Sequence, residues 1–164
     1  MKKLLFITLA AIFAIGVSAQ TEKGSKSALI KAGYQTEFKR FGIGVEGRYV
    51  ILENLRIAPD VIFQFPKDHT TGLDINLNVH YVFEVQDKLT VYPLAGLAVI
   101  NNRTSSFTVY DEKIPSFGDT SIGFNLGVGA GYDISDNGFL NAEFKYTFND
   151  WDFAAFMIGY GVRF

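Results

Sequence analysis

Residues 153–164 alternate between two kinds of side chain. Every second position back from Phe164 is apolar or aromatic, and the positions between carry small residues, a methionine or an arginine. The two sets are Phe164, Val162, Tyr160, Ile158, Phe156 and Ala154, and Arg163, Gly161, Gly159, Met157 and Ala155. A period of two is that of a β-strand with one apolar face and one narrow, partly polar face. Because a soluble domain rarely ends on such a strand, this stretch restricts the fold more than any other.

The same alternation recurs in eight segments of about 9 to 14 residues, near the length that a tilted strand needs to cross a bilayer. The segments are residues 28–38, 42–50, 55–65, 73–85, 89–100, 120–133, 139–148 and 153–164. The fifth segment is apolar on both faces. Its outer face is expected to carry Val91, Ala95, Leu97 and Val99. Pro93 has no amide donor, so we expect it at a strand end or a bulge.

The N-terminus has the three parts of a secretory signal peptide. Met1-Lys2-Lys3 is a basic tip, residues 4–17 are an apolar run, and small residues precede a cleavage position between Ala19 and Gln20. The apolar run is too short to span a membrane as a helix. The sequence therefore predicts a cleavable signal peptide at residues 1–19 and one mature domain at residues 20–164.

Composition excludes several classes of protein. The chain has no cysteine, which excludes a lipoprotein anchor, a disulfide framework and a thiolate metal site. Loss of Lys2 and Lys3 with the signal peptide leaves 13 basic residues against 17 acidic ones, so no basic excess favours nucleic acid as a partner. After the signal peptide, no apolar run approaches the length of a membrane-spanning helix.

An exported, apolar chain without such a helix enters a membrane as a closed barrel, because lipid tolerates no unpaired backbone groups. We therefore predict an all-β fold: an eight-stranded antiparallel up-and-down transmembrane β-barrel preceded by the signal peptide. The inside-out alternative is a soluble, lipocalin-like barrel with an apolar pocket. It conflicts with volume, because side chains only just fill an eight-stranded barrel and the apolar face here is dominated by bulky residues.

The narrow face of the predicted strands holds glycines and charged residues of both signs. We expect these charges to pair across the lumen and plug it, because an unpaired buried charge is costly. The predicted lumen charge network is Lys31, Glu37, Glu46, Arg48, Arg56, Asp60, Asp74, Glu143, Lys145 and Arg163.

The connections between segments predict two unlike rims. Tight polar turns at residues 53–54, 86–88 and 135–138 share one rim with both termini, and longer connections at residues 39–41, 66–72, 101–118 and 149–152 occupy the other. Four tyrosines lie on the apolar face near the tight-turn rim and predict an aromatic girdle at the headgroup level. They are Tyr49, Tyr81, Tyr132 and Tyr160.

Three turn segments look alike, at residues 49–55, 81–89 and 132–139. Joined to Tyr92-Pro93-Leu94-Ala95-Gly96-Leu97 and to residues 140–144, they resemble the small outer-membrane β-barrel domain family, the OmpA/OmpX-like "porin family" barrels in the style of Bacteroidetes. The resemblance covers the mature chain and implies a monomer in the outer membrane of a Gram-negative bacterium, in contact with its lipid. It also implies that the barrel assembly machinery reads the closing strand at Tyr160, Val162 and Phe164. Without a following peptidoglycan-binding domain, the chain resembles OmpX more than full-length OmpA.

The residues offer little catalytic chemistry, and we predict no catalytic, cofactor-binding or metal-binding residue and no cofactor. His80 is read as a satisfied interior polar residue, and no spacing supports a lipid-modifying set of His69 with Ser105 or Ser106. We predict a non-enzymatic outer-membrane barrel with a plugged, charge-lined lumen and a structural or surface-interaction role. The alternatives are a narrow pore for ions or small solutes, a lipid-modifying enzyme and a soluble ligand-binding barrel. The loop that begins at Asn101 and ends at Gly118 could extend the flanking strands above the membrane and offer an edge, and it is the predicted contact for a surface protein.

Overall fold

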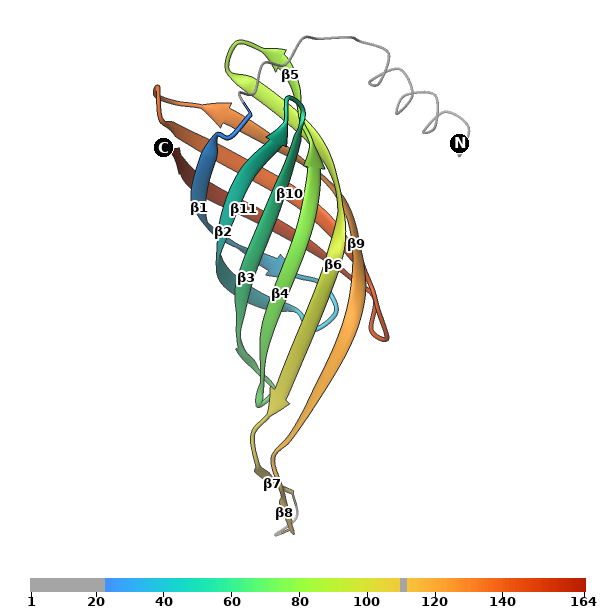
Figure 1. Ribbon diagram of the computed structural model, residues 1–164. Helices are drawn as coiled ribbons and strands as arrows, with labels where there is room; N and C mark the ends of the chain where they lie inside the picture. The colour runs from blue at the N-terminus through green and yellow to red at the C-terminus, as the bar shows by residue number, and fades with distance from the viewer. Residues whose placement is uncertain (1–22, 110–111) are drawn as a thin grey trace, which may run out of the picture.

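The computed structural model describes residues 23–109 and 112–164, and this part of the chain is all-β (Figure 1). The eight long strands are β1 (Lys26–Gln35), β2 (Arg40–Leu52), β3 (Leu55–Lys67), β4 (Thr70–Tyr81), β6 (Leu89–Thr104), β9 (Phe117–Asp133), β10 (Gly138–Phe148) and β11 (Phe153–Arg163). The short strands are β5 (Phe83–Gln86), β7 (Phe107–Val109) and β8 (Glu112–Ile114). No helix in the described ranges is long and apolar enough to cross a membrane. The predicted signal peptide, with its cleavage position between Ala19 and Gln20, lies outside the described residues.

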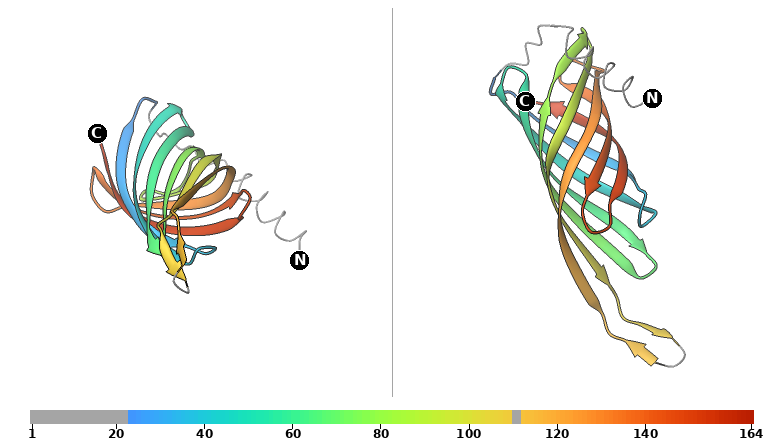
Figure 2. Two further views of the ribbon diagram at one scale, coloured as in Figure 1. Left: turned by 90° about the horizontal axis from the view of Figure 1, so that it is seen from below. Right: turned by 90° about the vertical axis from the view of Figure 1, so that its right-hand side faces the viewer.

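The eight long strands close into one antiparallel ring. Strands that follow one another in the chain lie side by side, with β4 paired to β6, and β1 pairs with β11 to close the sheet. The closing pair is in register from Ser27 to Gln35, with Ile30 opposite Tyr160. Seen from one end, the strands surround a central axis (Figure 2). The predicted eight-stranded up-and-down barrel is confirmed.

The two ends of the barrel differ. We call "termini rim" the end that holds residues 23–25, Arg163 and the turns at residues 53–54, 87–88 and 134–137. We call "hairpin rim" the end that holds the turns at residues 36–39, 68–69 and 149–152 and the β7–β8 hairpin. In Figure 1 the termini rim is uppermost and the hairpin rim is lowest.

Each strand turns apolar side chains outward and mostly polar or small ones inward. On β4, Ile75, Leu77 and Val79 are exposed, whereas Asp74 and Asn76 between them are buried. On the outer wall of the described strands, charged side chains occur only toward the strand ends. These residues are Lys26, Lys67 and Arg103.

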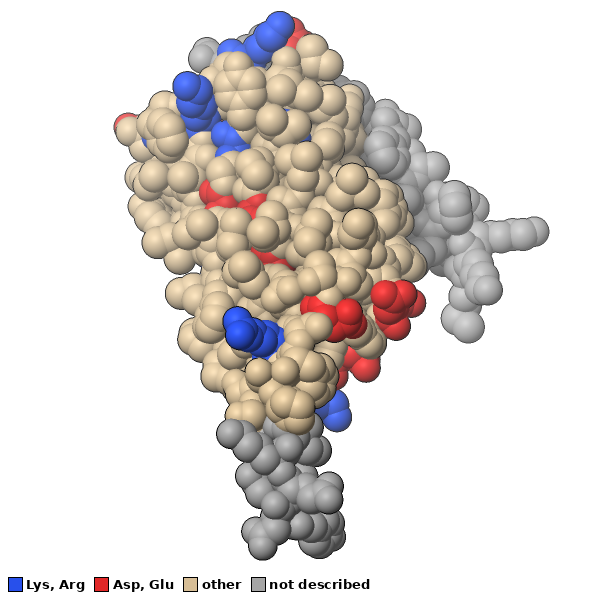
Figure 3. All heavy atoms as spheres, turned by 60° about the horizontal axis from the view of Figure 1, so that its bottom comes forward, with Lys and Arg blue, Asp and Glu red and all other residues tan. Residues whose placement is uncertain are grey.

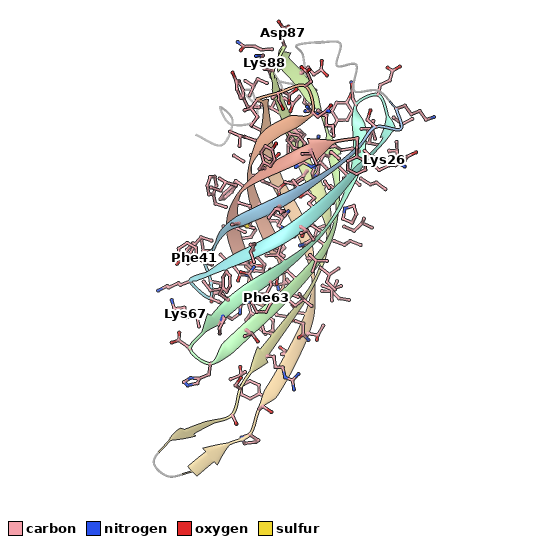
Figure 4. The ribbon with its side chains drawn as sticks, turned by 90° about the vertical axis from the view of Figure 1, so that its left-hand side faces the viewer. Lys26, Phe41, Phe63, Lys67, Asp87 and Lys88 are labelled. Carbon is pink, nitrogen blue, oxygen red and sulfur yellow. The ribbon has the colours of Figure 1, made fainter. Side chains whose placement is uncertain are left out.

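The space-filling and stick views agree with this division. The visible flank of the barrel is mostly uncharged, and charged side chains gather toward its two ends (Figure 3). Figure 4 shows Lys26 and Asp87 at the termini rim, with Phe41 and Phe63 farther along the wall. The apolar band is therefore on the outside, as the alternation predicts.

The long connection at residues 101–118 is predicted as an outer loop that could extend the flanking strands, and the structure shows such an extension over most of its length. β6 continues to Thr104, β9 begins at Phe117, and the two remain paired to the end, with Thr104 opposite Phe117. β7 and β8 then form a further two-stranded hairpin beyond them (Figure 2). Polar residues such as Asn101 and Arg103 obscure the pattern, but backbone pairing continues because two antiparallel strands can extend without a buried face.

The β3–β4 connection, predicted as residues 66–72, is also shorter. Lys67 pairs with Thr70, so only Asp68 and His69 form the turn. Both have positive φ, at 49° and 64°. Two-residue turns of this kind match the twist of the flanking strands, which explains how the strands run on to the turn.

The predicted segment at residues 73–85 is interrupted in the structure. β4 ends at Tyr81 and β5 begins at Phe83, while both pair with β6. The register that sets His80 opposite Leu94 brings Pro93 opposite Tyr81, where the proline has no amide to donate. Pro93 thus lies inside β6 and not at its end, and the irregularity falls on the neighbouring strand.

Candidate functional site

The barrel interior is the candidate site, because inward side chains of all eight long strands converge there. In the part of the chain that the structure describes, nine charged side chains are buried. The five cations are Lys31, Arg40, Arg48, Arg56 and Lys145, and the four anions are Glu46, Asp60, Asp74 and Glu143. Since a buried charge is costly unless it is paired and hydrogen-bonded, the contacts of these groups decide what the interior can do.

Lys31 is at the centre of the largest ion cluster. Its Nζ lies 2.7 Å from Glu46 Oε2, 2.8 Å from Asp60 Oδ2 and 3.7 Å from Glu143 Oε1. On both neighbouring strands the residue opposite Lys31 is a glycine, Gly44 on β2 and Gly159 on β11. These two positions leave room for the long side chain to reach carboxylates on β2, β3 and β10.

Two more cations complete this central cluster. Arg48 Nε donates to Glu46 Oε1 at 2.5 Å, and Lys145 Nζ lies 4.0 Å from Asp60 Oδ2. The central cluster therefore holds three cations and three anions. Its members are Lys31, Arg48, Lys145, Glu46, Asp60 and Glu143.

A layer of amides links the central cluster to the opposite wall. Asn76 Nδ2 and Asn78 Nδ2 donate to the two oxygens of Asp60, at 2.6 Å and 3.2 Å. Asn125 Nδ2 donates to the Oδ1 atoms of both asparagines at 2.9 Å, and its own Oδ1 accepts from Thr147 at 2.8 Å. The chain of contacts thus runs from β3 through β4 and β9 to β10 without leaving the interior.

A second layer, nearer the termini rim, is built around Tyr92. The His80 ring stacks on it at 4.4 Å, and the Arg56 guanidinium lies 4.6 Å from its centroid. The Tyr92 hydroxyl lies 2.9 Å from Asn141 Oδ1 and accepts from Arg48 Nη2 at 3.1 Å. Arg56 Nε donates to His80 Nδ1 at 3.1 Å. Aromatic and guanidinium planes therefore stack across the barrel here.

The third layer lies toward the hairpin rim. Arg40 Nε donates to Gln35 Oε1 at 3.0 Å, and Arg40 Nη2 donates to Asn102 Oδ1 at 2.5 Å. Gln64 Nε2 donates to Asp74 Oδ2 at 2.6 Å in the same region. An added Cβ at Gly72 would lie 2.4 Å from Arg40 Nη2, so the glycine leaves room for the guanidinium in this position.

Eight of the ten residues predicted for the lumen charge network point inward and are buried. They are Lys31, Glu46, Arg48, Arg56, Asp60, Asp74, Glu143 and Lys145. Arg163 lies instead at the termini rim, partly exposed, with Nη2 2.6 Å from Asp133 Oδ1. The prediction for Glu37 is wrong: β1 ends at Gln35, and Glu37 is exposed in the β1–β2 turn. The alternation of β1 continues by chance into the turn, which is why it misplaces this residue.

Sequence reasoning missed several interior residues, among them Arg40 and Tyr92. Arg40 was assigned to a loop, although β2 begins there. Tyr92 belongs to the segment that is apolar on both faces; the outer face expected there implies that this tyrosine points inward, but nothing local marks it as the centre of an interior layer. Its 1% exposure and position across from Gly129 follow from the β6–β9 register.

Apolar side chains also fill part of the interior. One buried cluster consists of Ala98, Ile100, Phe153 and Ala155, and another of Val82, Tyr92 and Leu94. Both include residues of β6, which explains why that segment is apolar on both faces. The lumen is therefore packed by ion pairs, amides and hydrocarbon together.

The glycines of β9 make room for the Tyr92 layer, and this can be tested by Gly129→Ala. An added Cβ would lie 2.3 Å from Tyr92 Cζ, and hydrogen bonds from Arg48 and to Asn141 hold that ring. We expect a loss of about 1–3 kcal/mol in the free energy of unfolding, as for other overpacked cores. Urea unfolding in lipid vesicles measures it. Gly118→Ala is the control, because its nearest neighbour would be at 3.6 Å, and equal effects of both changes would contradict the packing argument.

The interior also contains a set of groups with metal-ligand chemistry. One atom each of Glu46, His80 and Glu143 lies within 4.8 Å of the others. The Lys31 ammonium, however, is 2.7 Å from Glu46 and 3.7 Å from Glu143. A cation already held between the two carboxylates disfavours a metal ion there, because like charges repel.

The other histidine lies at the hairpin rim. The Ser105 amide donates to the His69 carbonyl at 2.8 Å, so the predicted pair is adjacent in space. Both residues, like Ser106, are exposed. The contact between His69 and Ser105 runs through main-chain atoms, which does not activate a hydroxyl for nucleophilic chemistry.

The four girdle tyrosines point outward near the termini rim. Tyr49, Tyr81, Tyr132 and Tyr160 are between 41% and 50% exposed. Tyr132 and Tyr160 lie on either side of Leu140, so they share one row of the sheet.

Comparison with known proteins places this geometry in context. A family model described as the outer membrane protein beta-barrel domain matches residues 7–164. No curated protein matches the chain. Among solved structures, it is similar to Ail, the attachment invasion locus protein of Yersinia pestis, with 18% identity and a TM-score of 0.64, covering 87% of this chain and 100% of that one.

Two further solved structures have similar folds. The N-terminal beta-barrel domain of Pseudomonas aeruginosa OprF is 17% identical, with a TM-score of 0.62, 87% of this chain covered and 100% of that one. Neisserial surface protein A is 20% identical, with a TM-score of 0.61, 85% of this chain covered and 94% of that one. At these identities the likeness concerns the fold alone.

Proposed function

We propose, from the premise that this chain belongs to the outer membrane protein beta-barrel domain family, that it is a non-enzymatic barrel with a plugged lumen and a structural or surface-interaction role. The family resemblance read from the turn segments is confirmed, and the protein belongs in the outer membrane of a Gram-negative bacterium. The soluble ligand-binding alternative is set aside, because the bulky apolar side chains line the outside of the barrel.

The observation that carries the plugged lumen is the continuous contact network across the barrel. Lys31 joins carboxylates from three strands, and the amide layer continues from Asp60 to Thr147. Barrels of eight strands have an interior that side chains just fill, whereas much wider porins keep an aqueous channel. Movement of an ion through this interior would require several buried ion pairs to separate together.

Conductance in a planar bilayer tests this proposal against the narrow-pore alternative. We expect the refolded protein to insert without stable single-channel steps, because the central cluster occupies the cross-section. Insertion is checked independently by the shift in gel mobility between unheated and heated samples. A general porin reconstituted in the same bilayer controls for detection, and reproducible unit steps from the heat-modifiable protein would reject the plugged lumen.

A non-enzymatic role is supported by the character of the polar groups. The carboxylates of the central cluster are engaged with Lys31, Arg48 and Tyr92, and the outer-rim pair of His69 and Ser105 meets through the main chain. We therefore keep the lipid-modifying enzyme as the weaker alternative.

A surface-interaction role is supported by the strands that extend past the barrel. Pairing of β9 with β10 starts at Phe124, and Ser121 still accepts from Asn149 Nδ2. Residues 117–120 therefore pair with β6 and have no strand partner on their other side in the described part of the chain. A strand edge of this kind offers backbone groups that another chain can pair with. This geometry supports the prediction that the segment from Asn101 to Gly118 contacts a surface protein.

The proposed function also implies an orientation of the barrel in the outer membrane. We place the termini rim in the periplasm and the girdle tyrosines at the headgroup level, where phenols prefer to lie. Reading of Tyr160, Val162 and Phe164 by the barrel assembly machinery stays a prediction, as does the monomeric state. Cleavage of the signal peptide after Ala19 also stays a prediction.

A further inference from the structure

A cavity of about 360 Å³ opens at the termini rim. Its lining includes buried side chains, among them Arg48 and Arg56, and exposed ones such as Lys26 and Asp87. Figure 4 shows Lys26 and Asp87 at this end of the barrel. The cavity therefore connects the Tyr92 layer to the outside. A purely structural role would not require such an opening.

The charges of the interior do not balance at this end. Five cations are buried against four anions, and the central cluster accounts for three of each. Arg40 and Asp74 are both in the layer toward the hairpin rim, which leaves Arg56. Among the described residues, no carboxylate lies within the 4.0 Å salt-bridge distance of Arg56.

The Arg56 side chain is nevertheless held in one place. Its Nε donates to His80 Nδ1 at 3.1 Å, and its guanidinium lies 4.6 Å from the centroid of the Tyr92 ring. Nη2 is buried and has no hydrogen-bond partner in the described part of the chain. The residue as a whole is 9% exposed, and it lines the cavity. An unsatisfied donor on a buried cation is expensive, so the residue is poised for an acceptor that arrives from the cavity.

We propose that the cavity at the termini rim binds an oxyanion, a phosphate or carboxylate group, through Arg56. A guanidinium suits this role, because its planar set of donors matches the oxygens of such groups. Lys26 at the mouth adds a second positive charge, whereas Glu84 and Asp87 in the same lining disfavour ligands of high negative charge. The site thus takes a singly or doubly charged group, either on a free small molecule or on a phospholipid headgroup at the periplasmic surface.

Inorganic phosphate is the first probe, titrated by calorimetry into the refolded protein in a detergent that carries no phosphate. We expect saturable binding that Arg56→Gln weakens at least about tenfold. Arg103→Gln, at the hairpin rim, removes the same charge far from the cavity and should leave the affinity unchanged. No saturable binding, or equal weakening by both variants, would overturn the proposal.

Two further variants keep the test decisive. Glu84→Gln removes a negative charge from the cavity lining and should tighten phosphate binding severalfold, since like charges repel. If Arg56→Gln does not fold, as judged by heat-modifiable mobility, Glu84→Gln decides the question, and an unchanged affinity would refute the site. Arg56→Lys keeps the charge without the planar donors and should bind with intermediate affinity.

The source of the anion is distinguished by a second titration. Glycerophosphoglycerol and a short-chain phosphatidylglycerol present the same singly charged phosphodiester without and with acyl chains. Equal affinity for both indicates a free small molecule as the ligand. Binding of the lipid at least about tenfold more tightly indicates a headgroup whose acyl chains lie along the apolar wall. Failure of this site would leave the plugged lumen untouched, because conductance tests that separately.

Discussion

Lys31→Met is expected to lower the free energy of unfolding by about 3–5 kcal/mol, the range found when one partner is removed from a buried ion pair. Lys31 is 1% exposed and contacts Glu46, Asp60 and Glu143. Methionine fills a similar volume but leaves three carboxylates with less compensating charge in a medium where an uncompensated charge is costly. Urea unfolding in lipid vesicles, followed by the fluorescence of Trp151, the single tryptophan, measures the loss.

Two variants make this result specific to the cluster. Lys26→Met removes the same group from an exposed position on the same strand, and we expect a change within about 0.5 kcal/mol. Adding Asp60→Asn to Lys31→Met removes one of the carboxylates that lost a counterion and should restore part of the lost stability, as coupled residues do in a double-mutant cycle. If Lys31→Met and Lys26→Met were equally mild, Lys31 would not be the centre of the interior.

The faces of the barrel could be predicted because they depend on local sequence alone. A strand with period two presents one face to each side whatever its neighbours are, so Ile75 and Asp74 are assigned before any partner is known. The existence of each strand could be predicted in the same way, from the alternation of its own residues. The outward direction of the bulky set followed from volume, since eight strands enclose little space.

The contacts inside the barrel could not be predicted, because they depend on the stagger of the strands. Whether Lys31 meets Asp60 or Asp74 is set by the registers of β1, β2 and β3, and no local pattern specifies the shear of a closed sheet. Arg40 was lost for the related reason that a strand end cannot be fixed to a residue from composition. Tyr92 was lost because β6 packs hydrocarbon on both faces.

The predicted ends of the strands were wrong in both directions, some too late in the chain and others too early. Alternation continued past the end of β1 and misplaced Glu37, whereas polar residues hid the continuation of β6 to Thr104. In each case the deciding interaction was backbone pairing with a distant strand, which hydrophobic periodicity does not report. The unpaired donor of Arg56 is likewise visible only in the assembled interior.

Ile75→Arg is expected to destabilise the barrel in a bilayer by about 2–4 kcal/mol, the cost measured for an arginine that faces lipid near the midplane. Ile75 is 49% exposed on the outer wall, between Val61 of β3 and Val99 of β6. Its partners are apolar, so the new charge gains no counterion from them. Urea unfolding in vesicles measures the cost, and Ile75→Met controls for the loss of the isoleucine itself, with an expected change below about 1.5 kcal/mol.

The dependence of this cost on depth in the bilayer distinguishes a wall that faces lipid from one that is exposed to water. Leu52→Arg makes the same kind of change at the last residue of β2, at the termini rim, where Leu52 is 56% exposed. An arginine near the interface costs only about 0–1 kcal/mol, since its long side chain reaches the headgroups. A barrel surrounded by water would tolerate both arginines equally, because both positions are exposed. Equal, small effects at positions 52 and 75 would therefore show that the apolar band does not face hydrocarbon, and the assignment of the lumen to the charged side chains would lose its physical basis.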